Sequence, residues 1–510
     1  MLAIIVSVRY YNNKTPQKVL EDTFTRSEEM KKSYICAILA AVLLLGCLSG
    51  CKTPAEPTDP TEPATPSTPS EPTDPSDSND PSEPTDPSEP EDEIMSSERV
   101  NYIPHAFTLN LYDAATNTYS FVWNTDEVAL APVVQLCEGE TFDAKTAVNY
   151  SAIQEDMVGE SSGEVHTTHV CKVRIPLEAG KTYSYRIYDT RAKIGSTSYT
   201  FTARDPRKES FTFVHLTDSQ VTDFSVNSGI PLNMILRRLE QWETPPEFLL
   251  HTGDVVQYGI SEKIWRYMLE TSEKQLSNMP FVTVGGNHEM VGYGGSQYDI
   301  LKHFDALMPE QDTAKGYYFS FDYGDVRFIQ LNTNEAFGAS KKLSDAQYNW
   351  LVEQLETNDK KWTIVSMHHA LYSVGSWGNN PAEVSITKGL RAQLSDLFAQ
   401  YGVDLVLQGH DHTNSYTYPI AEGCVALKNT ATEGDYFVNP DGVVYGMVGP
   451  AGNQEHDPWE TYEDFYKFAG RGYTSSWQEV TVEEDRITVT IKCIKNGAEE
   501  TVTTYGIIKN

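Results

Sequence analysis

The sequence has no Cys-x-x-Cys pair and no cluster of Cys with His, so a zinc-thiolate site is not expected. It also has little positive charge: 39 Lys and Arg against 72 Asp and Glu give a formal net charge of −33. Because nucleic-acid phosphates attract basic surfaces, this balance argues against nucleic acid as a structural partner. The charge is uneven, since residues 52–98 hold 14 acidic residues and one Lys, a net of 1 − 14 = −13. The acidic total therefore says little about a site elsewhere in the chain.

Long apolar runs are also missing. The apolar run Ile35–Leu45 is too short for a helix that crosses a bilayer of about 30 Å. Lys31 and Lys32 precede it and small residues follow, which is typical of a secretory signal, with Met30 as the expected true start. The tetrapeptide Leu-Ser-Gly-Cys that ends at Cys51 resembles the lipobox of bacterial lipoproteins. This resemblance implies cleavage before Cys51, lipid on its thiol, and an exported protein anchored on the extracellular face of the cell membrane.

Residues 52–98 are rich in Pro, Asp and Glu, and Pro-Thr-Asp-Pro recurs at 57–60, 72–75 and 84–87. Such a segment cannot bury enough apolar surface to offset its chain entropy. Frequent proline and like charges favour an extended chain, so we expect a disordered stalk. Past the stalk, Cys137 and Cys171 could form a disulfide or stay as buried thiols, as could Cys424 and Cys493.

Two folded domains are expected after the stalk. Residues 99–206 alternate apolar and polar positions in short β-forming runs, which predicts a β-sandwich. Residues 207–510 alternate apolar runs with helical stretches, which predicts an α/β domain. The expected strands of that domain are 211–217, 248–252, 281–284, 326–331, 362–367 and 403–407, with helices at 231–242, 262–276 and 344–355. The tail, residues 479–508, returns to period-two strands.

Polar residues that can bind metal follow five of these strands. In α/β domains, ligands gather beyond the carboxyl ends of the strands. The five segments contain, in order, Asp218 and Gln220; Asp254; Asn287 and His288; His368; and His410 with His412. Oxygen and imidazole donors without thiolate suit Mn²⁺, Fe, Zn²⁺ or Mg²⁺. A single strand-end Asp is more often a helix cap, but five such segments in one domain favour a metal site.

These segments resemble, in order, the five signature blocks of the calcineurin-like metallophosphoesterases: Asp218-Ser-Gln220, Gly253-Asp254, Gly286-Asn287-His288-Glu289, His368 and Gly409-His410-Asp411-His412. The sandwich resembles the fibronectin-III-like domain of the purple-acid-phosphatase-like branch. The resemblance implies a four-layer α/β/β/α catalytic domain with two divalent metal ions. Asp254 would bridge them. Asp218, His412 and Gln220 would hold one ion, and Asn287, His368 and His410 the other.

Two positions depart from the family pattern. Gln220 stands where the first block usually has His, and an amide oxygen is a weaker ligand than imidazole. In the purple enzymes a tyrosine three residues after the bridging aspartate binds Fe(III), but here that position is Gln257. We therefore expect no Fe(III)–tyrosinate centre. Tyr258, His369 and Tyr372 are candidate pocket residues, with His368 rather than His369 as the ligand.

The resemblance also implies the reaction. Two ions would neutralise a phosphate ester and activate a water molecule for attack on phosphorus, with His288 as general acid. Two alternatives stay open: a phosphodiesterase on the same metal site, and an inactive surface binding protein. Phosphomonoester hydrolysis at the cell surface is the leading hypothesis.

Overall fold

The computed structural model describes residues 99–161, 164–222, 228–290, 297–309, 317–381 and 384–510. The signal peptide, Cys51 and the acidic stalk lie outside these residues, so those predictions are not addressed by the fold. All six predicted strands of the α/β part are present, as β10 Phe211–Leu216, β11 Leu249–His251, β12 Phe281–Thr283, β14 Val326–Leu331, β15 Trp362–Met367 and β16 Leu405–Gln408. The three predicted helices are α3 Ile230–Leu239, α4 Glu262–Leu276 and α7 Asp345–Glu356.

Two large sheets carry the site. The first has twelve strands in the order β20-β21-β26-β25-β24-β10-β11-β12-β1-β2-β6-β5, and the second has seven in the order β13-β14-β15-β16-β22-β17-β23. In the first, β10, β11 and β12 are parallel; in the second, β14, β15 and β16 are parallel. The strands not yet placed are β1 His105–Asp113, β2 Thr118–Thr125, β5 Ile153–Ser161, β6 Glu164–Pro176, β13 Phe319–Tyr323, β17 Asn414–Thr417, β20 Thr432–Glu433, β21 Tyr436–Val438, β22 Val444–Met447, β23 Tyr466–Gly470, β24 Ser476–Val482, β25 Arg486–Lys495 and β26 Ala498–Ile508.

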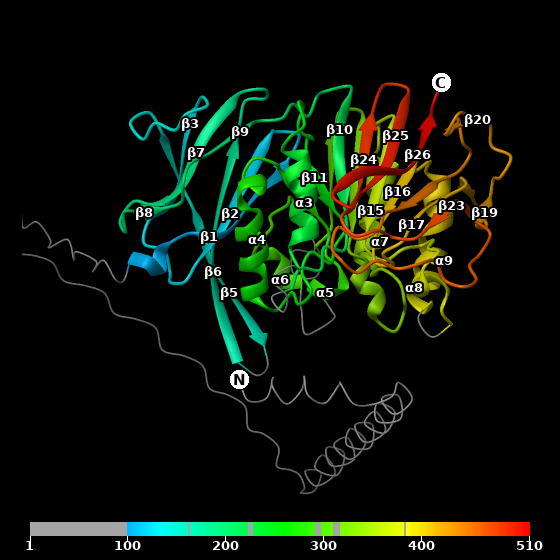
Figure 1. Cartoon of the computed structure of the whole chain (residues 1–510), viewed down its shortest axis with the longest axis horizontal. Coiled ribbons are helices and arrows are strands. Elements are labelled where there is room, and N and C mark those ends of the chain that lie inside the picture. The colour runs from blue at the N-terminus through cyan, green and yellow to red at the C-terminus, as the bar shows by residue number, and fades with distance from the viewer. Residues whose placement is uncertain (1–98, 162–163, 223–227, 291–296, 310–316, 382–383) are drawn as a thin grey trace, which may run out of the picture. The chain divides into compact units, whose positions relative to one another are not determined.

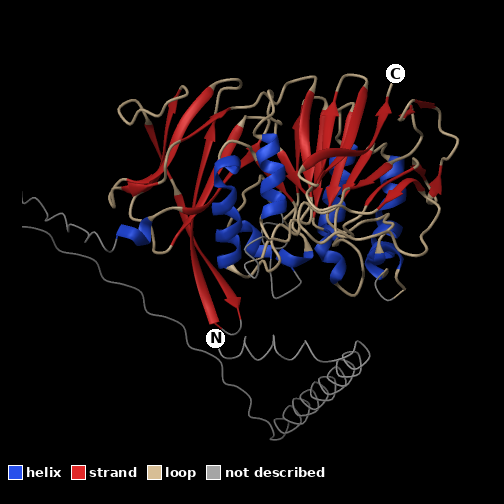
Figure 2. Ribbon diagram, viewed as in Figure 1, coloured by secondary structure: helices blue, strands red, loops and turns tan. Residues whose placement is uncertain are grey.

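Side chains of the second sheet alternate between two separate cores. Phe328, Ile364 and Leu405 join the main core, which also contains β10, β11, α3 and α4. Their neighbours along the strands, Ile329 and Val365, join a second core with α7 and α9 (Ser385–Gln400). Because successive strand residues face opposite sides, this sheet is buried on both faces. The order is therefore helices, sheet, sheet, helices (Figures 1 and 2), and the predicted α/β/β/α layering is confirmed.

The predicted β-sandwich is built from the end of the twelve-stranded sheet and a smaller sheet. The smaller sheet runs β4-β3-β7-β8, with β9 also paired to β7. Its strands are β3 Pro132–Glu138, β4 Val148–Ser151, β7 Thr182–Asp189, β8 Ile194–Gly195 and β9 Tyr199–Thr202. Aromatic rings fill the space between the two sheets; Phe121 lies 5.0 Å from Tyr185 and Phe107 lies 5.7 Å from Tyr199, between centroids.

The sandwich is continuous with the α/β layers. Strand β1 pairs in parallel with β12 at Asn110 and Phe281, so the first sheet runs through both parts. Arg174 of β6 and Ser120 of β2 both bind the carboxylate of Asp305, which lies between β12 and β13. All the described residues belong to one compact unit. The site-bearing strands thus rest on a sheet that the sandwich extends.

Cys137, Cys171, Cys424 and Cys493 are free thiols, which answers the alternative left open by the sequence. Burial raises the pKa of Cys171 to about 12, so this thiol is inert. Among the residues that the structure describes, no helix has the length and apolar character needed to cross a membrane.

Candidate metal centre

The predicted site residues follow the carboxyl ends of parallel strands in both sheets. Asp218, Asp254 and Asn287 come after β10, β11 and β12 of the first sheet, whereas His368 and His410 come after β15 and β16 of the second. Because the sheets pack face to face, these ends converge at one edge of the interface between them. The structure brings all seven predicted ligands and His288 together there, and each described contact among them joins segments far apart in the chain.

The backbone of the site is unusual. Asp218, Gln220, Asp254, His410 and His412 all have positive φ angles, between 39° and 77°. Residues other than glycine rarely adopt this left-handed region, and such strain clusters at functional sites. Two glycines make the approach of the loops feasible: a Cβ on Gly253 would lie 2.5 Å from the nitrogen of Gly286, and a Cβ on Gly286 would lie 2.0 Å from Oδ1 of Asp254.

One group of donors surrounds Nε2 of His368. This atom lies 3.0 Å from Oδ1 of Asn287, 3.3 Å from Oδ2 of Asp254 and 3.2 Å from Nδ1 of His410. Ligands about 2.1 Å from one ion, at about 90–110° to each other, are about 3.0–3.4 Å apart. The spacing of these four side chains therefore fits a shared metal ion.

A second group lies around Asp218. Its Oδ1 is 3.2 Å from Nε2 of His412, and its Oδ2 accepts the backbone N–H of His410 at 2.8 Å. Oε1 of Gln220 is buried without a hydrogen-bond partner. Ligand atoms of Asp218, Asp254 and His368 all lie within 4.8 Å of one another. Buried carboxylates this close need a cation, so these residues also fit a metal ion.

Carbonyl groups set the tautomers of three histidines. Nδ1 of His368 donates to the carbonyl of Thr252 at 2.8 Å, and Nδ1 of His412 donates to the carbonyl of Gln454. Nδ1 of His288 donates to the carbonyl of Gln257, also at 2.8 Å. A carbonyl can only accept, so Nδ1 carries hydrogen and Nε2 faces the site. For the two candidate ligands, this is the arrangement in which the outer hydrogen bond orients the ring toward a metal.

Charges in the site perturb each other strongly. Burial alone would raise the pKa of Asp254, but His368 and His288 outweigh burial and hold it below its usual range. Burial lowers the pKa of His368, yet Asp254 and Asp218 more than compensate and raise it to about 9. The buried carboxylates of Asp254 and Asp218 thus favour positive charge at this point of the site.

His288 lies beside the predicted ligands. Its Nε2 is 3.2 Å from Nε2 of Gln220, which donates to it, and 3.6 Å from Oδ2 of Asp254. Gln220 also donates to Oδ2 of Asp254 at 3.3 Å. The ring is therefore held beside the carboxylate of Asp254 and the amide of Gln220.

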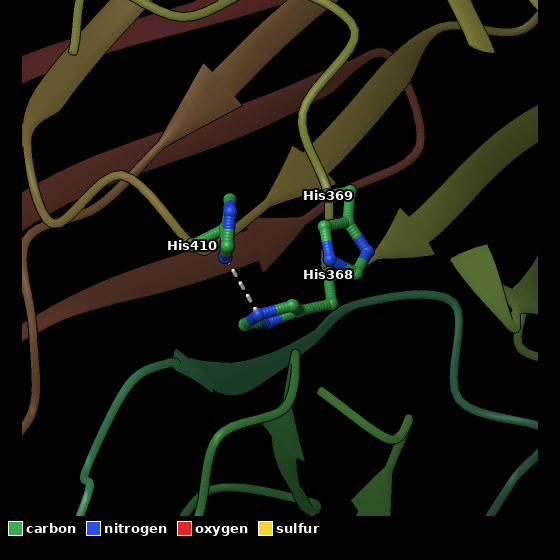
Figure 3. Close-up of side chains that lie close together, drawn as sticks. All are labelled: His368, His369 and His410. Carbon is green, nitrogen blue, oxygen red and sulfur yellow. Dashed lines mark hydrogen bonds between the residues drawn. The ribbon is translucent and has the colours of Figure 1, made fainter. Parts of the chain in front are cut away.

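The three candidate pocket residues have different surroundings. His369 is buried beside His368 and His410 (Figure 3). Tyr372 lies in the second core, where its hydroxyl binds that of Ser395 at 2.8 Å. Tyr258 is partly buried and packs against the main core. By these contacts Tyr372 is a packing residue, and His369 is the candidate closest to the metal donors.

Glu289 was given no role in the sequence analysis, although it follows His288 directly. It is fully buried and accepts the backbone N–H groups of Asp254 at 2.8 Å, Gly286 at 2.9 Å and Val256 at 3.0 Å. Burial, with the nearby charge of Asp254, raises the pKa of Glu289 to about 8. One buried carboxyl group thus ties together the two loops that carry Asp254 and Asn287. Its place in the Gly-Asn-His-Glu segment was the available signal.

Exposed rings lie against the buried histidines. Trp377, 39% exposed, has its ring 4.8 Å from that of His410, and His456 stacks on His412 at 4.7 Å. Asp411 fixes the Trp377 segment by accepting its backbone N–H at 2.9 Å. Trp377 belongs to the short helix α8 (Ser376–Asn379), and His456 to the connection between β22 and β23. They provide an aromatic rim at the solvent side of the donors.

Comparisons with known proteins agree with this geometry. The family model described as calcineurin-like phosphoesterase matches residues 211–414, from β10 to just beyond His412. Purple acid phosphatase 21 of Arabidopsis thaliana is 25% identical over 371 residues, which cover 71% of this chain and 74% of that protein. Human acid phosphatase type 7 is 28% identical over 222 residues, covering 41% of this chain and 48% of that protein. The match thus spans about half of the human protein.

A solved structure is similar in fold. The purple acid phosphatase PPD1 from yellow lupin (Lupinus luteus) seeds aligns with a TM-score of 0.66 and 18% sequence identity, over 80% of this chain and 75% of that chain. The aligned region is larger than the α/β part alone. At this identity the likeness shows a shared fold.

Proposed function

We propose that the protein is a two-metal phosphomonoesterase. The starting point is that the chain contains a calcineurin-like phosphoesterase domain, is homologous to the purple acid phosphatases and is a phosphoester hydrolase. The observation that carries the proposal is the set of donors around Nε2 of His368, at 3.0–3.3 Å. The names of the relatives, acid phosphatases, favour phosphate monoesters as the substrate class.

The residues divide between two ions. Asn287, His368 and His410 would hold one ion, and Asp218, Gln220 and His412 the other. Asp254 would lie between them, since its carboxylate is close to both groups. When bound, the two ions supply positive charge for the phosphate oxygens and lower the pKa of a water molecule. The protein's part is to hold these donors at fixed spacing in a buried, strained frame.

His288 is proposed to protonate the leaving oxygen. The carbonyl of Gln257 accepts the hydrogen of Nδ1, and Nε2 faces Gln220 and Asp254, so Nε2 must take up a proton before it can act as the acid. A group that donates a proton to the leaving oxygen matters most when that oxygen is strongly basic. We expect His288→Asn to slow an alkyl phosphate at least tenfold more than p-nitrophenyl phosphate, whose leaving group needs little protonation. An equal loss on both substrates would contradict this role.

The central experiment combines metal analysis with assays on one chromogenic monoester and one diester. We expect two metal ions per chain and faster turnover of the monoester. Asp254→Asn should lower both metal content and turnover, with His303→Phe, a buried histidine outside the site, as the control. Faster diester turnover would favour a phosphodiesterase, and no turnover by protein with two bound ions would favour a binding protein. Full metal content and activity in Asp254→Asn would refute the site.

Surface anchoring is also proposed, on the sequence alone. The support is the basic, apolar and small-residue pattern that ends at Cys51, followed by the acidic stalk. We expect the full chain, expressed in bacteria, to fractionate with membranes and the Cys51→Ala variant to be released. Retention of the variant in the membrane fraction would contradict a lipid anchor.

A further inference from the structure

A third histidine belongs to the group at the ends of β15 and β16. Nitrogen atoms of His368, His369 and His410 all lie within 4.8 Å of one another. The ring of His369 is 4.6 Å from that of His410 and 4.9 Å from that of His368, between centroids. Figure 3 shows the three side chains directed toward a common space. Neighbours in a strand would face opposite sides, but His368 and His369 come just after β15, where the chain has left the sheet.

The two nitrogens of His369 have different surroundings. Nδ1 lies 2.9 Å from Oγ1 of Thr333, which also accepts the backbone N–H of His369 at 3.0 Å. Nε2 is buried and has no hydrogen-bond partner, although the residue is only 1% exposed. An unpaired polar atom at such a depth costs free energy unless a ligand satisfies it.

The hydrogen bond at Nδ1 leaves Nε2 of His369 available as a ligand atom. When Nδ1 donates its hydrogen to Thr333, Nε2 keeps a free lone pair, and an oxygen that orients the outer nitrogen in this way is typical of metal-binding histidines. Phe337 packs edge-on against the ring at 5.0 Å and restricts its rotation.

We propose that Nε2 of His369 is a further ligand of the ion held by Asn287, His368 and His410. Two ligands of one ion, each about 2.1 Å away, can be at most about 4.2 Å apart. One nitrogen of each ring already lies within 4.8 Å of the others, so a small movement of the rings would bring the three residues within that range. This inference rests on the proposed function, because it assigns one more donor to the same centre.

The added nitrogen would distinguish the two ions chemically. The His369 side would have three imidazoles beside Asn287 and Asp254, whereas the Asp218 side would have one imidazole, His412, among oxygen donors. Imidazole-rich sites suit Zn²⁺, Cu²⁺ or Ni²⁺, and oxygen-rich sites suit Mg²⁺ or Mn²⁺. The extra histidine thus predicts unequal affinities of the two positions for a given metal.

The test measures metal binding rather than turnover. His369→Phe keeps a flat ring but removes both nitrogens, and Thr333→Val removes the outer hydrogen bond. In calorimetric titrations of metal-free protein with Zn²⁺, we expect His369→Phe to weaken the tighter of two binding events by at least about 10-fold, and Thr333→Val by about 10-fold. Pulsed EPR of protein loaded with one equivalent of Cu²⁺ should count three coupled imidazoles in the wild type and two in His369→Phe.

Controls separate this inference from the proposed function. His303→Phe removes a fully buried histidine that stacks on Trp265, and it should leave Zn²⁺ affinity unchanged even if stability falls. Unchanged Zn²⁺ affinity and an unchanged imidazole count in His369→Phe would overturn the inference while leaving the two-metal centre intact. Weaker inhibition by inorganic phosphate with unchanged Zn²⁺ binding would overturn it too, and would assign His369 to the substrate. Failure of the wild-type protein to bind any of Mn²⁺, Fe, Zn²⁺ or Mg²⁺ would refute the proposed function instead.

Discussion

Glu289 is expected to hold the two metal-binding loops together, and its removal should damage both stability and metal binding. Its Oε2 accepts the N–H groups of Asp254 and Gly286, and its Oε1 accepts that of Val256. Leaving a buried donor without a partner costs about 1–3 kcal/mol. Glu289→Ala leaves three such donors without an acceptor, so we expect the free energy of unfolding to fall by at least about 3 kcal/mol.

The Glu289→Gln variant gives a graded comparison. Its amide oxygen can keep the two bonds to Asp254 and Gly286, but its NH₂ group would then face the N–H of Val256. One mismatched buried donor predicts a loss of about 1–3 kcal/mol, less than for Ala. Urea unfolding of the metal-free protein measures the stability, and Zn²⁺ titration measures the affinity, which we expect to fall about 10–100-fold in Glu289→Ala. Equal stability and affinity in all three proteins would refute the reasoning.

Three further predictions follow from the same contacts. Metal binding should release a proton and strengthen as pH rises toward 9, because the raised pKa of His368 leaves it protonated at pH 7 while a ligand must be neutral. Calorimetry in buffers of different ionisation enthalpy measures this proton release. Metal binding without proton release would contradict the pairing of His368 with Asp254. Iron-loaded protein should show no tyrosinate-to-iron absorption band, because Gln257 occupies the tyrosine position; a band that survives Tyr258→Phe would identify another ligand. Trp377→Ala should raise the KM for an aryl phosphate about 2–10-fold, since a stacked aromatic ring contributes about 0.5–1.5 kcal/mol to binding. The KM for glycerol phosphate should stay unchanged. Equal increases of KM for the two substrates would exclude stacking on Trp377.

Local sequence patterns were sufficient for the elements that were predicted by residue range. Buried strands such as β14 and β15 are continuous apolar runs, and α4 has an amphipathic repeat, so each was predictable within a few residues. Strand β5 had no comparable signal. Most residues of β5 for which exposure is described are exposed, so no apolar alternation marked it. The pairing of β1 with β12 was also unpredictable, because it depends on contacts between residues about 170 positions apart.

The sequence by itself determined which residues could bind metal and which reaction they suit, because donor type and position after a strand are local properties. Tertiary structure decided which of them meet. Asn287 and His368 belong to different sheets, and only the packing of those sheets brings their donor atoms to 3.0 Å. Tertiary structure also separated two residues that were both predicted to line the pocket: His369 lies among the donors, whereas Tyr372 lies in a core. The local sequence indicates where each strand ends, but the distance between two strand ends depends on how the layers pack.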